Sequence, residues 1–141
     1  LRWGGETVGL RHVAGHTGGD LVVRLHLADI VHAGDLFFNC GYPYIDTAHG
    51  GSIDGMIRGV QYVLSLCGPA TRIVPGHGPL ATPAELRIYL GILEEYRRID
   101  QPLAELDVGV AARPAAALDE QWGQAMFPPE AFIEMIWLST P

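Results

Sequence analysis

Three short glycine-flanked loops, each following a run of apolar residues, constrain this chain most. The loops read Gly15-His16-Thr17-Gly18-Gly19-Asp20, Gly34-Asp35 and Pro75-Gly76-His77-Gly78-Pro79. Each carries a side chain of a metal-ligand type, and glycine lets the backbone turn sharply where a strand ends. The three side chains can converge only if their strands lie in one sheet with these ends at the same edge. The sequence therefore predicts that His16, Asp35 and His77 cluster at one sheet edge.

Size and composition fit a single globular domain. The 141 residues are 48% hydrophobic and 18% charged, which is enough to bury a modest core. The net charge of −7 and the lack of a basic stripe argue against a nucleic-acid partner. No apolar run approaches the roughly 18 residues of a membrane span, so no membrane partner is expected.

The termini and the cysteines leave the cellular compartment open. No N-terminal signal peptide is visible, and Leu1-Arg2-Trp3 is not typical of a natural start, so we expect an upstream segment. Cys40 and Cys67 do not have metal-ligand spacing, and the sequence alone does not pair them. The localisation is unknown from the sequence.

Apolar runs predict the strands. They cover residues 8–13, 21–28, 30–33 and 71–74. In the second run, alternation places Leu21, Val23, Leu25 and Leu27 on one face, which we expect to be buried. Asp29 breaks this run, and the short connection to the next one predicts antiparallel neighbours.

Helical periodicity and caps predict the helices. Ser52 caps a helix that ends at Gly68-Pro69, and Thr82-Pro83-Ala84-Glu85 forms a capping box for a second helix that ends before Pro102. The first apolar stripe is Ile53, Met56, Ile57, Val60, Val63 and Leu64; the second is Leu86, Tyr89, Leu90, Leu93 and Tyr96. The predicted order β-β-β-α-β-α defines an α/β fold.

A helical appendage is predicted after a linker. Residues 114–117 read as the linker, and Pro128-Pro129 opens a last helix. Its apolar residues are Phe132, Ile133, Ile136 and Trp137. We expect Trp3, Trp122 and Trp137 to be core or appendage anchors.

The three ligand candidates suit zinc or a similar divalent ion. Imidazole and carboxylate are hard-to-borderline ligands. A lone histidine is more often a surface or core residue, and the spacing here is not that of a zinc finger or an HExxH helix. Spacing alone therefore leaves a metal site and a metal-free structure equally open.

The motif order resembles the C-terminal half of the metallo-β-lactamase superfamily. The motifs are GHTGGD, VHAGDLFF and IVPGHGP, and the stretch GYPYID…GGSIDGMI is similar to metal-dependent hydrolases of quinoprotein and sulfur-oxidation systems. The resemblance extends over about residues 7–100. It implies half of an αββα sandwich at residues 1–100, with residues 101–141 as a helical C-terminal extension.

The resemblance also implies roles for the ligand candidates. His16 would bind the first of two zinc ions, His77 the second, and Asp35 would bridge both and act in catalysis, because a carboxylate has two oxygens. A water or hydroxide between the metals would be the nucleophile. The HxHxDH motif of the N-terminal half is absent from this chain. We therefore expect half of a site and no activity from this chain alone.

Other polar residues near the motifs have two interpretations. Tyr42, Tyr44 and His49 could flank a substrate, although a Tyr-Pro-Tyr turn packed on its own sheet is the simpler interpretation. Asp20 is expected to fix the His16 loop. His32 is expected to face away from Asp35 along its strand.

The leading functional hypothesis is a fragment or remnant of a metal-dependent hydrolase that cleaves an ester, thioester, lactam or similar bond. The alternative is a metal-free homo-oligomeric interaction or structural module that keeps the half-fold. Related di-iron proteins perform redox work, but no flavin-type module supports that reaction here.

A half-sandwich leaves one sheet face open. A homodimer, or the C-terminal appendage folded back, could cover that face.

Overall fold

The computed structural model of the chain describes residues 1–100, 122 and 127–139. Its strands form one five-stranded sheet in the order β1-β2-β3-β4-β5. The strands are β1 (Arg2–Trp3), β2 (Glu6–His12), β3 (Leu21–Leu25), β4 (Ile30–Phe38) and β5 (Arg72–His77). The helices are η1 (Thr47–His49, a 3-10 turn), α1 (Ile53–Ser65), α2 (Pro83–Asp100) and α5 (Pro129–Ser139). The predicted α/β class and element order are confirmed, with β1 as an additional short strand.

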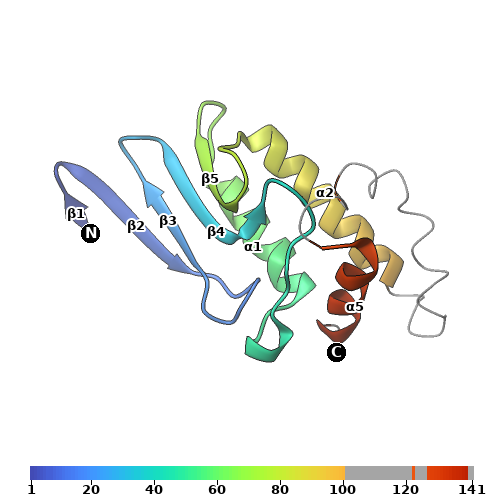
Figure 1. Ribbon diagram of the computed structural model, residues 1–141. Helices are drawn as coiled ribbons and strands as arrows, with labels where there is room; N and C mark the ends of the chain where they lie inside the picture. Colours follow the sequence, from blue (N-terminus) through green and yellow to red (C-terminus); the bar gives the residue numbers. More distant parts are fainter. Residues whose placement is uncertain (101–121, 123–126, 140–141) are drawn as a thin grey trace.

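The sheet is mixed. The pairs from β1 to β4 are antiparallel, as predicted for β3 and β4, whereas β4 and β5 are parallel. Helix α1 forms the crossover between the two parallel strands and packs against β4, with α2 beside it (Figure 1). No helix in the described part of the chain has the length and apolar character needed to cross a membrane.

Strand β4 is longer than predicted. The sequence indicated an end at Ala33, but the strand continues to Phe38. Gly34 adopts a left-handed conformation with φ 56° and lies at a shift in the β4–β5 register. Beyond this irregularity Phe38 pairs with His77, and the side chains of Leu36, Phe37 and Phe38 are buried. A glycine at an irregular ladder position bends a strand without ending it.

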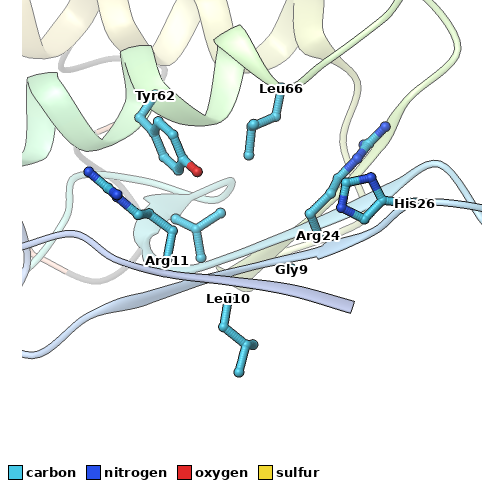
Figure 2. A pocket seen from close by; sticks show the side chains of 8 residues that line it. Gly9, Leu10, Arg11, Arg24, His26, Tyr62 and Leu66 are labelled. Carbon is cyan, nitrogen blue, oxygen red and sulfur yellow. The ribbon is translucent and has the colours of Figure 1, made fainter. Parts of the chain in front are cut away.

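Strand β3 is shorter than predicted and buries the opposite face. It ends at Leu25, and Asp29 in the following turn has φ 53°. Val22 is buried, whereas Leu21 is 51% and Leu27 is 76% exposed, so the predicted burial of the leucine face is wrong. Leu10 of β2 points to the side of the sheet away from Tyr62 and α1 (Figure 2). Alternation identifies two faces of a strand but not the face that the helices cover.

Both predicted helix caps are present. The Ser52 hydroxyl accepts a hydrogen bond from the Gly55 N–H. The Thr82 N–H donates to Glu85 Oε2 at 2.7 Å, which is the return half of a capping box. The predicted stripes face the core. The core residues that α1 and α2 contribute include Ile53, Met56, Val60, Val63, Leu86, Tyr89, Leu93 and Tyr96.

Helix α5 joins the helical layer instead of the open sheet face. It packs on α2 and η1, and its Phe132, Ile133 and Ile136 are buried. Trp137 and Trp3 are 56% and 82% exposed, so their prediction as anchors is wrong. Trp122 packs against the core as a partly buried residue. The predicted linker at residues 114–117 lies outside the described residues.

A carboxylate in the β3–β4 turn generates a pH-dependent prediction. Asp29 accepts hydrogen bonds from the Thr71 hydroxyl at 2.8 Å and from the Arg24 guanidinium. These bonds, that of Thr71 first, hold the pKa of Asp29 below its ordinary value of 3.8. A carboxyl whose pKa is lower in the folded state contributes stability above the unfolded pKa, and that stability is lost as the pH falls through the folded pKa.

We therefore expect Asp29→Asn to lower the free energy of unfolding at neutral pH. The difference from the unmodified chain should shrink below about pH 4, where the unfolded carboxyl is protonated. Urea unfolding at several pH values measures this, with Glu134→Gln on the exposed side of α5 as a control. A constant difference between pH 7 and pH 3 would contradict the assignment.

Candidate functional site

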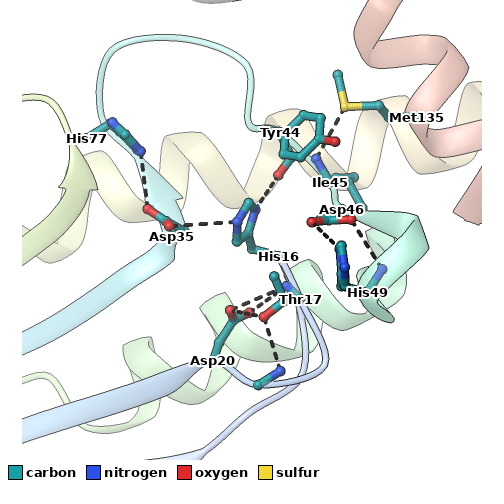
Figure 3. Close-up of polar contacts among 11 residues, drawn as sticks. His16, Thr17, Asp20, Asp35, Tyr44, Ile45, Asp46, His49, His77 and Met135 are labelled. Carbon is teal, nitrogen blue, oxygen red and sulfur yellow. Dashed lines mark hydrogen bonds and ion pairs between the residues drawn. The ribbon is translucent and has the colours of Figure 1, made fainter.

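The three predicted ligand side chains converge at one edge of the sheet (Figure 3). His16 lies in the loop after β2, Asp35 lies within β4, and His77 ends β5. Asp35 Oδ2 is 3.7 Å from His16 Nε2, and Asp35 Oδ1 is 3.3 Å from His77 Nε2. Each carboxylate oxygen therefore faces a different imidazole.

The backbone holds the His16 ring in one orientation. His16 Nδ1 lies 2.7 Å from the carbonyl oxygen of Tyr44. A carbonyl only accepts, so Nδ1 carries the proton and donates. In a neutral imidazole the lone pair is then on Nε2, which faces the carboxylate of Asp35. Nε2 and the carboxylate therefore both direct lone pairs into the space between them, which suits a cation. A hydrogen bond from the other ring nitrogen to a carbonyl oxygen is the usual support of a metal-binding histidine.

The His16 loop is fixed by its own side chains. Asp20 accepts from the Thr17 N–H at 3.1 Å and from the Thr17 hydroxyl at 2.8 Å, so the predicted structural role of Asp20 is confirmed. Gly51 allows the loops to approach, because a Cβ at this position would lie 2.1 Å from the His16 carbonyl oxygen. The sequence did not indicate this contact.

Close backbone packing also positions His77. Its ring stacks on Phe38, with centroids 4.6 Å apart, and its carbonyl accepts from the Asn39 N–H at 2.8 Å. Gly78 follows with φ 93°, and a Cβ there would lie 2.6 Å from the Asn39 carbonyl oxygen. The β5 loop is therefore locked against the end of β4.

The three side chains do not form a complete site for one ion. Among the described residues, no group of three or more His, Cys, Asp or Glu is arranged to hold a single metal. The two oxygens of Asp35 point to different histidines, so each side offers one nitrogen and one oxygen. A tetrahedral zinc site has four ligands. The donors fit zinc chemically and fit a bridging carboxylate, but each ion would lack further ligands.

The three predicted substrate-flanking residues lie in different environments. Tyr42 is buried, and its hydroxyl bonds that of Tyr96 at 2.7 Å. His49 has a 77% exposed side chain bonded to Asp46. Tyr44 lies against the site, with its ring centroid 5.8 Å from that of His16. Of the three, Tyr44 contacts a ligand candidate directly, and the substrate roles stay predictions.

Other residues complete the surroundings of the site. The ring of Phe127 stacks on Tyr44 at 5.6 Å, a contact that sequence reasoning missed because no local pattern links the two segments. His32 accepts from the Gly34 N–H and is exposed. Cys40 and Cys67 are both free thiols, and burial raises the pKa of Cys67.

Comparison with solved structures identifies the fold. A metallo-beta-lactamase from Pontibacter korlensis has a TM-score of 0.56 at 22% identity, over 67% of this chain and 44% of that one. The B3 metallo-beta-lactamase BLEG-1 has a TM-score of 0.56 at 23% identity, over 66% and 44%. DIM-1 metallo-beta-lactamase has a TM-score of 0.53 at 24% identity, over 64% and 45%. The chain therefore carries about half of the metallo-β-lactamase fold.

The names of the curated relatives give no information about activity. Uncharacterized proteins of Mycobacterium tuberculosis and Mycobacterium bovis are 34% identical over 100 residues, which is 67% of this chain. The chain spans 44% of the length of these relatives. No protein-family model matches the chain.

The position of Asp35 depends on the absence of a side chain at Gly76. A Cβ there would lie 2.1 Å from Asp35 Oδ1 and 2.8 Å from the Gly34 carbonyl group. We expect Gly76→Ala to displace the carboxylate and to lower the free energy of unfolding by about 1–3 kcal/mol, as overpacking does. Chemical unfolding and zinc titration measure the two effects.

Gly91 provides the matched control. It lies in α2, and a Cβ added at this position would meet no packed neighbour within 4 Å. Gly91→Ala should raise the stability by roughly 0.5–1 kcal/mol, because alanine is the better helix former. Equal stability and zinc affinity in the two variants would refute the close-contact argument.

Proposed function

We propose that this chain contributes part of the binuclear metal centre of a hydrolase. The observation that carries the proposal is the Asp35 carboxylate with one oxygen directed toward each of two histidines. This arrangement suits a carboxylate that bridges two divalent ions. His16 would hold one ion and His77 the other, with zinc as the ion that such donors favour.

The chain's own residues would position the ions and the substrate. The Tyr44 carbonyl orients His16, and Phe38 supports the His77 ring. Bound zinc lowers the pKa of water and polarises a carbonyl oxygen, so we propose an ester, thioester, lactam or similar bond as the substrate. The further ligands of each ion would come from the complementary half of the fold. Because these ligands are missing, we expect little or no activity from residues 1–141 alone.

The metal proposal predicts weak and Asp35-dependent binding. Two protein donors per ion leave water to complete the coordination, so zinc titration should give low affinity for the unmodified chain. Asp35→Asn should lower the affinity further, by about tenfold or more, because each ion loses its charged ligand. His26→Ala removes an exposed histidine that lies away from the Asp35 edge and should leave zinc binding unchanged.

Catalysis is tested separately. We expect no appreciable hydrolysis of nitrocefin or simple esters by the chain with added zinc. Metal-dependent turnover that is abolished in Asp35→Ala would show a complete enzyme and overturn the half-site proposal. Equal zinc affinity in the Asp35→Asn and unmodified chains would overturn the bridging role.

A second candidate function is a metal-free homo-oligomeric module. The observation that favours it is the apolar face of the sheet on the side away from α1. Leu10 and Leu21 are 52% and 51% exposed, and the register places Leu10 beside Val23 on β3. An exposed apolar patch of this kind marks a contact surface, and a two-fold dimer would pair two such faces.

Sedimentation at micromolar concentration tests this candidate. The chain should be a dimer, and Leu10→Lys should shift it to monomer, because a buried unpaired charge would disfavour the contact. Ile88 on α2 is 56% exposed and lies away from this face. Ile88→Lys likewise replaces an exposed apolar side chain with a charged one, and it should leave the dimer intact. A monomer for the unmodified chain would rule the dimer out.

A further inference from the structure

A pocket lies on the helix side of the sheet, apart from the three ligand candidates. It has a volume of ≈ 320 Å³, is open to solvent on one side, and is lined by residues of β2, β3, the turn after β3 and the C-terminal half of α1. Figure 2 shows Tyr62 and Leu66 extending from the helix toward the strands. The volume is at the low end of the range for small-molecule sites.

The charged side chains around this pocket are all of one sign. Arg11 and Arg24 line it together with the imidazole of His26, and no carboxylate is among the lining residues. Arg11 lies at one end of the pocket, and Arg24 and His26 lie at the other (Figure 2). This cationic lining occurs in a chain whose net charge is −7, so it is a local arrangement and not a property of the whole surface.

One of these cations has a buried donor without a partner. The Arg24 side chain is 16% exposed, and its Nη2 bonds the Asp29 carboxylate. Its Nη1 is buried and makes no hydrogen bond to any residue that the structure describes. A buried donor that is left unsatisfied destabilises the folded state. This atom has no accessible surface, so an anion in the pocket would interact with the charge of Arg24 at longer range and not with this donor.

The remaining walls are apolar or aromatic. Val22 is buried and lines the pocket from β3, and Leu66 lines it from the C-terminal end of α1. The Arg11 guanidinium lies 5.9 Å from the centroid of the Tyr62 ring, within the range of a cation–π contact. This contact holds the guanidinium beside the pocket while its donors remain available.

A glycine makes room at the other end. A Cβ on Gly9 would lie 3.2 Å from His26 Nε2 and 3.6 Å from Arg24 Cβ. Both side chains therefore lie over Gly9, and a side chain at position 9 would reduce the space that they occupy. Gly9 thus permits the arrangement of the two basic side chains.

We propose that this pocket binds a small organic anion, with a carboxylate or phosphate group held by Arg11, the charge of Arg24 acting at longer range, and an apolar or aromatic body against Val22, Tyr62 and Leu66. Phenyl phosphate and benzoate are the probes, because they carry the two anionic groups on the same ring. Inorganic phosphate tests whether the apolar body contributes. The proposal is independent of the metal centre.

Isothermal titration with metal-depleted protein tests the proposal. Removing metal excludes anion binding at the Asp35 edge, and a His16→Ala variant should bind the probes as the unmodified chain does. Arg11→Gln should weaken phenyl phosphate binding by about tenfold or more, as expected for loss of a charge-assisted hydrogen bond. Arg24→Gln should weaken it less, because the Arg24 charge acts at longer range. Tyr62→Leu should weaken the aromatic probes more than inorganic phosphate.

Arg58→Gln is the matched control, since it removes the same charge from an exposed position on α1 outside the pocket. Arg24→Gln also breaks the bond to Asp29, so Arg11→Gln decides the outcome if that variant unfolds. Binding that is equal in Arg11→Gln and Arg58→Gln overturns the proposal. No measurable binding of either aromatic probe by the unmodified chain also overturns it and leaves the arginines a structural role beside the C-terminal end of α1.

Discussion

The parallel pairing of β4 with β5 is the contact on which the rest of the structure depends. It places the ends of both strands at the same edge, so that Asp35 and His77 meet there. The same pairing buries Val31 and Ile73 at the centre of the core. A parallel pair requires a crossover, and α1 supplies it while covering the inner face of the sheet. The candidate centre and the core are therefore consequences of one strand pairing.

Glycines at the site let backbone segments approach one another closely enough to position the ligand candidates. Gly76 lets β5 approach the Asp35 carboxylate. Gly51 lets the segment between η1 and α1 approach the His16 carbonyl. The Tyr44 carbonyl can then orient the His16 ring. The chemistry of the proposed centre thus rests on backbone contacts as much as on its ligands. Stability and metal binding should be coupled at this edge, whereas the cationic pocket beside α1 is separate from it.

The two faces of the sheet have different environments. The inner face is packed against helices, and α5 extends that layer over residues near Tyr42 and Ile45. The outer face exposes Leu10 and Leu21. This asymmetry agrees with half of a layered fold and with coverage of 44% of the similar metallo-beta-lactamases. Both functional proposals follow from it, since a complementary half would complete the metal ligands and a second copy would cover the apolar face.

The sequence by itself determined the α/β class and the helix caps, because periodicity and capping residues act locally. Its glycine loops predicted the convergence of His16, Asp35 and His77, but the parallel pairing of β4 with β5 is what brings Asp35 and His77 together. The sequence did not determine the length of β4, since pairing beyond Gly34 depends on β5, nor the buried face of β3, since alternation is symmetric between faces. The exposure of Trp3 and Trp137 and the Phe127–Tyr44 contact likewise depend on distant segments. Only the tertiary structure decided that the two oxygens of Asp35 face different histidines, because side-chain direction at a strand irregularity depends on what packs against it.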